Sequence, residues 1–165
     1  MLAQMGGSAA ALRAHEEVFA YWASRRVGDR PPGRANIDPC DFKRHLPTIS
    51  LIDVVGTTTT RRYRVRLAGT GLYGVYGREI TGKALDEVYE AGPADYWRAE
   101  LDAVVDRRRP GVGSHSLAWR GQSHLSILWL RLPLADETGL VNMILGYDMV
   151  VGANRPSLSS GIRAA

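Results

Sequence analysis

The sequence predicts a single α+β domain built on an antiparallel sheet. In residues 62–67, arginines alternate strictly with apolar side chains, which is typical of a half-buried antiparallel strand. Two segments, 9–26 and 93–108, carry apolar residues at helical spacing, and a proline opens the second. Strand-like segments with glycine-containing turns follow it at 112–119, 124–134 and 140–151. The predicted order is therefore a helix, two strands, a helical insert and three strands.

The first predicted helix begins after residues 1–8, which are expected to be disordered. It covers 9–26, where an apolar stripe recurs at helical spacing: Leu12, Phe19, Trp22 and Ala23. Residues 27–36 hold two glycines and two prolines, so a loop is expected there. Asp38-Pro39 then matches a capped helix start, and Pro47 is expected to end that short helix.

The two strands before the insert form the first predicted hairpin. Residues 48–55 are rich in β-branched side chains, and Gly56 with four threonines supplies the turn. The alternation of the second strand points one set of side chains toward the core: Tyr63, Val65 and Leu67. It points the other set away: Arg62, Arg64 and Arg66. Glycines between positions 69 and 82 favour short helical turns after this strand.

The helix at 93–108 and the last three strands complete the predicted core. The helix turns Trp97 and Leu101 inward. The strand at 124–134 is apolar on both faces, with Ile127 and Trp129 on one and Leu128 and Leu130 on the other. Pro133 lacks a backbone donor, so it is expected at a bulge or an unpaired edge. The domain is expected to span 9–151, with a flexible tail at 152–165.

Composition and charge narrow the class of protein. Hydrophobic residues make up 45% of the 165 residues, enough for one buried core. No apolar run reaches the roughly 20 residues that cross a bilayer, no signal peptide is evident, and Cys40 has no disulfide partner. A cytoplasmic protein without membrane contact is therefore expected. The net charge of +4 raises a nucleic-acid adaptor as one alternative, but the basic residues are spread beside 17 acids, which argues against it.

The sequence holds no motif that assigns catalysis or a metal. Gly69-Thr70-Gly71-Leu72-Tyr73-Gly74 has dinucleotide-fingerprint spacing, but the arginine-bearing strand before it is unlike a buried parallel strand, so sharp turns are the preferred interpretation. The four histidines are scattered, so no metal site is expected. With no nucleophile elbow, no catalytic residue is assigned and a non-enzyme is predicted. The alternative is a small cavity enzyme of the isomerase or dehydratase kind, using Asp53 with His115.

An apolar pocket is predicted between the sheet and the insert. The inward faces of the strands and of the long helix give its candidate lining: Tyr63, Val65, Leu67, Trp97, Leu101, His115, Leu117 and Leu128. A core filled by these side chains is the alternative. Asp53 and Asp148 lie within apolar strands, where either is interpreted as an edge or sheet-face acid paired with an arginine, and a catalytic base is the alternative. The three outward arginines of the second strand either meet acids of this chain, such as Asp53, Glu16 or Glu17, or recognise an acidic partner.

Several local motifs, taken in order, resemble the PAS superfamily, and in particular a compact bacterial PAS family of largely unassigned function. They lie between Tyr21 and Gly146 and comprise Tyr21-Trp22, Ile37-Asp38-Pro39, Leu46-Pro47, Asp53-Val54, Arg66-Leu67-Ala68-Gly69-Thr70, Tyr76-Gly77-Arg78-Glu79-Ile80-Thr81-Gly82 and Leu132-Pro133-Leu134. The resemblance implies a five-stranded antiparallel sheet of order 2-1-5-4-3, with the insert on one face.

The resemblance also implies a sensor or interaction module in bacterial signal transduction. Such domains bind a small ligand under the insert, dimerise through the sheet and the N-terminal helix, and signal to an output. With no room here for an output domain, a separate signalling protein is the expected partner. A homodimer is expected, with Phe19, Trp22 and the three arginines as the partner surface. The long helix lacks the histidine of haem-binding relatives and the chain lacks the Asn-Cys-Arg motif of flavin photosensors, so the cofactor is unknown.

Overall fold

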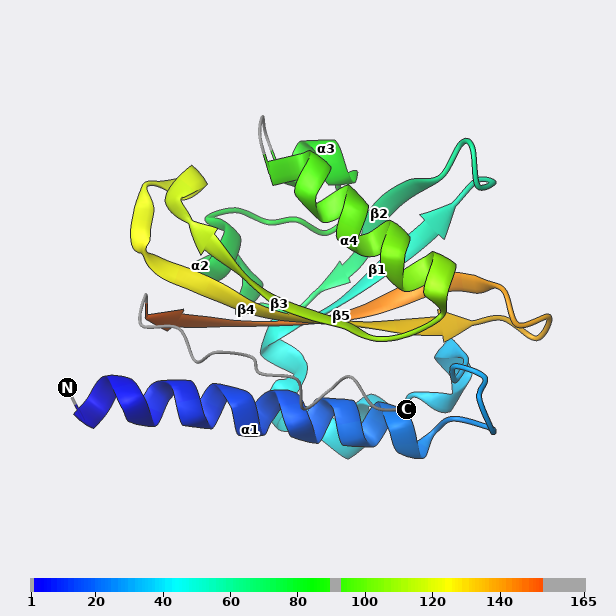
Figure 1. Cartoon of the computed structure of the whole chain (residues 1–165), viewed down its shortest axis with the longest axis horizontal. Helices are drawn as coiled ribbons and strands as arrows, with labels where there is room; N and C mark the ends of the chain where they lie inside the picture. Colours follow the sequence, from blue (N-terminus) through cyan, green and yellow to red (C-terminus); the bar gives the residue numbers. More distant parts are fainter. Residues whose placement is uncertain (1, 90–92, 153–165) are drawn as a thin grey trace.

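The computed structural model, which describes residues 2–89 and 93–152, has a five-stranded antiparallel sheet at its centre (Figure 1). Its strands are β1 (Ile49–Val55), β2 (Arg62–Ala68), β3 (Gly111–Leu117), β4 (Gln122–Ala135) and β5 (Val141–Gly152). They lie in the order β2-β1-β5-β4-β3, and every neighbouring pair is antiparallel. The predicted fold class and strand order are therefore confirmed.

Helices cover the two faces of this sheet in separate layers. The insert contributes α2 (Leu72–Tyr76), α3 (Leu85–Val88) and α4 (Pro93–Arg107) to one side, while α1 (Leu2–Ser24) runs along the other (Figure 1). We call these sides the insert face and the outer face. Short 3-10 helices η1 (Arg34–Asn36), η2 (Pro39–Thr48) and η3 (Ala118–Arg120) complete the chain. None of the helices in the described ranges is long and apolar enough to cross a membrane.

The bounds of the first helix differ from the prediction. α1 begins at Leu2 rather than at residue 9, and it ends at Ser24 rather than at residue 26. Gly6 and Gly7 have low helix propensity, and the residues before position 9 show no apolar periodicity, so the sequence alone does not predict a helix there. The tail expected at 152–165 lies outside the described residues, except for Gly152, which ends β5.

The central strands β4 and β5 carry a hydrophobic core on each face. On the insert face, Ile127, Trp129 and Ile144 pack against the insert helices. On the outer face, leucines and aromatic residues pack against α1 and η2: Leu130, Leu132, Leu134, Leu145 and Tyr147. Since both faces of these strands are buried, they read as nearly continuous apolar runs.

Trp22 fixes α1 on the outer face of the sheet. Its side chain is 2% exposed, and its indole Nε1 donates a hydrogen bond of 2.9 Å to the carbonyl oxygen of Pro133. Pro133 pairs with β5 on one side only, because the ladder between β3 and β4 ends at Gly111 and Arg131. Pro133 is thus at the unpaired edge that was predicted. Trp22, by contrast, is buried within its own chain, which corrects its placement on a partner surface; Phe19 beside it is half-buried.

A bulge in β2 reverses the predicted direction of Leu67. Leu51 of β1 pairs with Leu67, whereas Ile52 pairs with Val65, so Arg66 is an extra residue in the ladder. One added residue changes the face on which the following side chain lies. Tyr63 and Val65 are buried on the insert face as predicted, but Leu67 lies on the outer face and is 49% exposed.

Leu128 also lies on the outer face, not in the predicted pocket. It is 1% exposed and packs with Ala11 of α1 and Val151 of β5. Its neighbours Ile127 and Trp129 are the β4 residues that face the insert. Because side chains alternate along a strand, Leu128 and Trp129 cannot line the same pocket.

Candidate functional site

A buried ion pair lies at the centre of the insert face. Nη1 of Arg131 on β4 is 2.7 Å from Oδ1 of Asp148 on β5, and Nη2 is 3.3 Å from Oδ2. The two residues are 2% and 1% exposed. Burial alone would lower the pKa of the Arg131 guanidinium, but the charge of Asp148 raises it overall. Since an unpaired charge is costly in the protein interior, each side chain requires the other.

Two tyrosines of the insert extend this polar centre. The hydroxyl of Tyr76 donates to Oδ2 of Asp148 at 2.8 Å, and it lies 3.0 Å from the hydroxyl of Tyr89. Burial, and then the charge of Asp148, raises the pKa of Tyr76 well above its usual range. Tyr76 therefore stays a neutral hydrogen-bond donor. One buried hydrogen-bond network links four side chains in the order Tyr89, Tyr76, Asp148 and Arg131.

Glycines on the strands make room for this centre. A Cβ at Gly146 would lie 2.4 Å from Oγ of Ser50 and 3.2 Å from Nη1 of Arg131. A Cβ at Gly113 would lie 2.5 Å from the ring of Trp129. Because real Cβ atoms do not approach neighbours so closely, both positions need glycine if the arginine and the indole are to keep their places.

Aromatic rings surround the guanidinium. Its Cζ lies 4.9 Å from the ring centroid of Trp97 and 5.9 Å from that of Trp129, so Arg131 makes two cation–π contacts. Trp97 in turn stacks on Tyr89, with ring centroids 5.2 Å apart. Two buried donors, Nε of Arg131 and Nε1 of Trp97, have no hydrogen-bond partner in the part of the chain that the structure describes.

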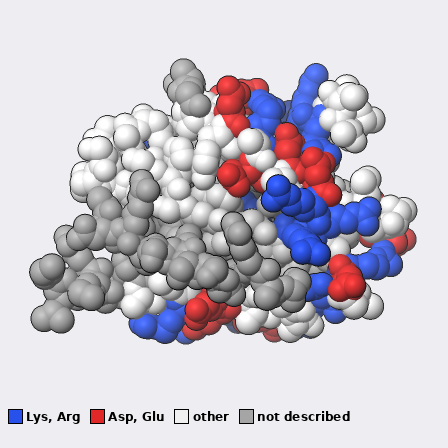
Figure 2. All heavy atoms as spheres, in the orientation of Figure 1, with Lys and Arg blue, Asp and Glu red and all other residues white. Residues whose placement is uncertain are grey.

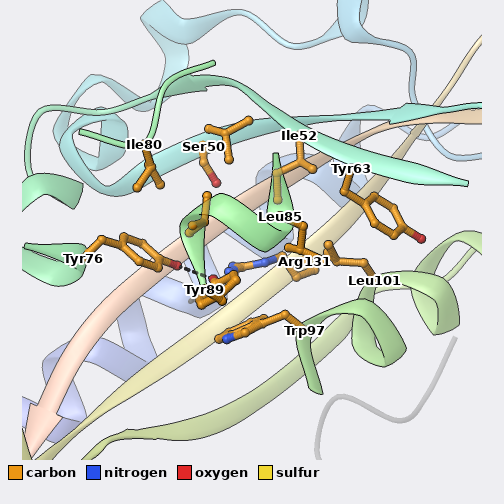
Figure 3. A pocket seen from close by; sticks show the side chains of 12 residues that line it. Ser50, Ile52, Tyr63, Tyr76, Ile80, Leu85, Tyr89, Trp97, Leu101 and Arg131 are labelled. Atoms are coloured by element: carbon orange, nitrogen blue, oxygen red, sulfur yellow. Dashed lines mark hydrogen bonds between the residues drawn. The ribbon is translucent and has the colours of Figure 1, made fainter. Parts of the chain in front are cut away.

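The cavity beside Arg131 is small (Figure 3). The space open to the centre of a water molecule is about 20 Å³. That volume suits one ordered water rather than a cofactor, whose pockets usually measure roughly 300–1,000 Å³. Its lining combines the strands with the insert: Ser50, Ile52, Tyr63, Val65, Tyr76, Ile80, Leu85, Val88, Tyr89, Trp97, Leu101 and Arg131. The interior is thus close to the filled core that was the alternative prediction.

The structure brings together four of the eight predicted pocket residues at this cavity, namely Tyr63, Val65, Trp97 and Leu101. His115 and Leu117 lie on the insert face beside it but do not line it. His115 contacts the ring of Tyr96 at a centroid distance of 4.4 Å, and burial lowers its pKa. Leu67 and Leu128, as described above, are on the other side of the sheet.

The residues that sequence reasoning missed are mainly the polar ones. Asp148 was expected to pair with an arginine, and it does, but Arg131 was not identified as its partner. The available signal was an arginine in the middle of an apolar run, where both faces of the strand are buried. The second predicted pair is also present, because Nε of Arg66 lies 2.8 Å from Oδ1 of Asp53.

A second and larger hollow, the outer groove, lies on the outer face beside α1. Its volume is about 480 Å³. Its lining comes from β1, β2, β5, η1, η2 and the segments next to them. The lining residues are Arg34, Ile37, Pro39, Phe42, Lys43, Leu46, Pro47, Ile49, Leu51, Leu67, Ala68, Gly69, Thr70 and Leu145. The groove is mostly apolar, and Leu67, at 49% exposed, is the most exposed large hydrophobic residue in it.

The arginine stripe, Arg62, Arg64 and Arg66, lies on β2, the strand that contributes Leu67 and Ala68 to this groove. All three are exposed and lie on the outer face, opposite in direction to Tyr63 and Val65. Arg66 pairs with Asp53. Glu17, which was expected among the acids answering the stripe, instead pairs with Arg44 and His45. Within the described residues, Arg62 and Arg64 have no ion-pair partner.

The structure does not bring Asp53 and His115 together, the acid–base pair on which the alternative enzyme prediction depends. Asp53 lies opposite Arg64 and bonds to Arg66 on the outer face, whereas His115 packs with Tyr96 and Trp97 on the insert face. The sheet separates the two groups, so they cannot act in one cavity. In the described ranges, no group of three His, Cys, Asp or Glu side chains is arranged to hold a metal ion.

The glycine cluster after β2 has the structural role that was preferred for it. A Cβ at Gly69 would lie 2.1 Å from the carbonyl oxygen of Leu46, and the amide of Gly71 donates to the carbonyl of Pro47 at 2.8 Å. These contacts attach the loop to η2, so Gly69 is needed for a close backbone approach.

Basic and acidic side chains are interleaved on the visible surface in Figure 2, which agrees with the spread of charge in the sequence.

Comparison with family models matches this chain over residues 11–149 to the family described as PAS domain. The match takes in the sheet, the insert and much of α1. This chain belongs to the PAS domain family. PAS homologues are sensory domains in signalling proteins. No match was found among curated proteins.

Solved structures with the same fold include the PAS domain of BvgS from Bordetella pertussis. It is 19% identical, with a TM-score of 0.51 over 70% of this chain and 88% of that one. A sensory box sensor histidine kinase from Vibrio cholerae is 15% identical, with a TM-score of 0.47 over 68% and 85%. A PAS domain from Colwellia psychrerythraea is 12% identical, with a TM-score of 0.46 over 69% and 98%. At such identity the likeness to BvgS shows the fold alone.

Proposed function

We propose that this PAS domain is a non-enzymatic signalling module that acts by binding a protein partner at the outer groove. The observation that carries the proposal is the contrast between the interior cavity and the outer groove. The interior offers about 20 Å³, whereas the outer groove offers about 480 Å³. The groove also exposes Leu67 on a mainly apolar surface, and exposed apolar patches of this kind mark interaction sites.

Photo-crosslinking tests this proposal at a single position. A photoreactive phenylalanine analogue replaces Leu67, and in a matched control it replaces Tyr73, which is 59% exposed on α2 of the insert. We expect one protein to be crosslinked at position 67 and not at position 73. Equal capture at both positions, or capture at neither, would overturn the proposed function.

A second candidate function is supported by the unpartnered Nε of Arg131 at the interior cavity. A buried donor beside a small space favours an occupant that accepts a hydrogen bond. A space of about 20 Å³ holds one water, and the carboxylate of a small ligand would enter only if lining side chains moved. A ligand there would act on the same two strands that hold α1. Arg131 and Asp148 alternate with Leu130 and Tyr147, whose side chains lie on the outer face under α1 and η2.

Native mass spectrometry separates this candidate from the first. Replacing the ion pair by Arg131→Met with Asp148→Leu removes the donor together with both buried charges. A small bound mass in the wild-type protein that is missing in the double variant would support a ligand-sensing role. If the two proteins carry the same bound mass, or if neither carries one, the ligand-sensing role is excluded.

A further inference from the structure

The outer groove has an apolar floor with raised walls. Ile49 and Leu51 of β1 and Leu145 of β5 are buried at its base. Phe42 and Leu46 of η2 line it, as does the half-exposed Leu67 of β2. An occupant that fills it must therefore present apolar side chains, because polar groups would be left there without partners.

The charged side chains that line this groove have one sign. Two cationic residues, Arg34 and Lys43, belong to its lining, and no aspartate or glutamate does. Arg62 and Arg64 lie outside this lining, farther along β2, and carry further positive charge without an ion-pair partner among the described residues. Asp53, the acid beside these arginines, is already engaged by Arg66. The arrangement favours an occupant with acidic residues beside its apolar ones.

The free edge of β2 does not offer a simple place to add a strand. The amide of Val65 donates to the carbonyl of Lys83 at 2.9 Å, and the amide of Gly82 donates to the carbonyl of Val65 at 2.7 Å. The segment after α2 thus already occupies the middle of this edge. Recognition at the groove must then depend on side chains, as when an amphipathic helix lays its apolar face into a hydrophobic groove.

Two segments of this chain are unsuited to fill the groove. Its C-terminal stretch, residues 153–165, contains Arg155 and Arg163 and no acidic side chain. The apolar side of α1 is already committed, since Val18 and Trp22 are buried against the sheet. These two observations favour an occupant from another molecule.

We infer that the outer groove binds an acidic amphipathic helix of a signalling partner, an inference that rests on the proposed function. The apolar side chains of the helix, spaced at i, i+3 or i+4 and i+7, enter the groove beside Leu67. Its acidic flank lies along Arg62 and Arg64. Apolar contact supplies most of the affinity, while the charges supply orientation and a faster association.

Peptide selection on the whole chain tests this inference. A phage-displayed library of random 16-residue peptides is selected on the wild-type protein, and the enriched peptides are synthesised and titrated by fluorescence polarisation. We expect net negative peptides with apolar residues at helical spacing. Their affinity should fall ~10-fold or more for Arg62→Glu with Arg64→Glu, and for Leu67→Glu. It should also weaken as salt rises.

A matched variant controls for charge alone. Arg107→Glu with Arg109→Glu makes the same change of charge at exposed positions near the end of α4 and should bind as the wild type does. Circular dichroism checks that each variant is folded. The two groove variants, Arg62→Glu with Arg64→Glu and Leu67→Glu, should both weaken peptide binding, so each is a control for the other. Failure to enrich peptides, enrichment of neutral or basic peptides, or equal binding by all variants would overturn the inference.

Two other occupants give results that would also overturn it. The first is a membrane surface. It would be indicated if the wild-type protein binds no selected peptide but floats with phosphatidylglycerol-containing vesicles, and if Arg62→Glu with Arg64→Glu abolishes that flotation. Self-association in sedimentation velocity that is lost in Leu67→Glu would indicate a second copy of this chain. If position 67 crosslinks a protein but the selected peptides are not acidic, the proposed function holds while the chemistry inferred for the partner fails.

Discussion

His15 of α1 makes the docking of this helix sensitive to pH. Its side chain is 2% exposed, its ring lies 5.1 Å from that of Tyr147, and neither ring nitrogen has a hydrogen-bond partner among the described residues. Burial lowers the pKa of His15 from 6.5 to about 4. The charge of Asp148 and the backbone of Leu128 oppose that shift only in part, and the charges of Arg131 and His45 add to it.

The sign of the effect follows from the lowered pKa. Below pH 6.5 the unfolded chain takes up a proton at His15, whereas the folded chain takes it up only near pH 4, so stability is lost between these values as pH falls. A difference of about 2.5 pKa units corresponds to ~3 kcal/mol at most. At pH 5.5 the loss is about 1 kcal/mol, and at pH 7.5 almost none is expected.

The variant His15→Leu isolates this contribution, because leucine is apolar and similar in size. Urea unfolding at pH 7.5 and 5.5 should show the variant gaining about 1 kcal/mol relative to the wild type on acidification. His124→Gln, at an exposed position of β4, is the control and should leave the pH dependence as it is in the wild type. Parallel curves for wild type and His15→Leu at both pH values would refute the account of this helix interface.

Three further changes test the packing around the site. Arg131→Met should cost about 3–5 kcal/mol because it leaves a buried carboxylate unpaired, while adding Asp148→Leu should restore most of that loss in urea unfolding. Gly113→Ala should lower stability by about 1–3 kcal/mol, since its Cβ would meet a tryptophan ring on β4; Gly74→Ala, which meets nothing within 4 Å, is the control and should cost nothing. Trp22→Phe removes the hydrogen bond to β4, so amide exchange in α1 should become faster while exchange in α4 stays unchanged.

The sequence pattern predicted the architecture well because strand and helix periodicities differ clearly. The alternation in β2 placed Tyr63 and Val65 correctly on the insert face. It failed at Leu67, because the bulge at Arg66 is set by the register with β1 and leaves no local mark in the sequence. Leu128 was misplaced for another reason. β4 is apolar on both faces, so hydrophobicity alone does not tell which side chains face the insert.

The polar centre was harder to predict because it depends on long-range pairing. Asp148 was recognised as an unusual acid in an apolar strand, yet its partner Arg131 lies 17 residues away on β4. The chain contains many arginines, and only the register between β4 and β5 determines which of them pairs with Asp148. The cavity volume likewise depends on how Trp97 and Tyr89 stack, which periodicity does not determine.

The central claim is that this domain signals through its outer groove and not through its interior. Isothermal titration with the purified partner captured at position 67 tests the claim directly. Leu67→Glu should weaken the binding of that partner ~10-fold or more, while Arg131→Met with Asp148→Leu should change it by less than about twofold. Loss of binding in the interior variant, with Leu67→Glu binding as tightly as the wild type, would contradict the account.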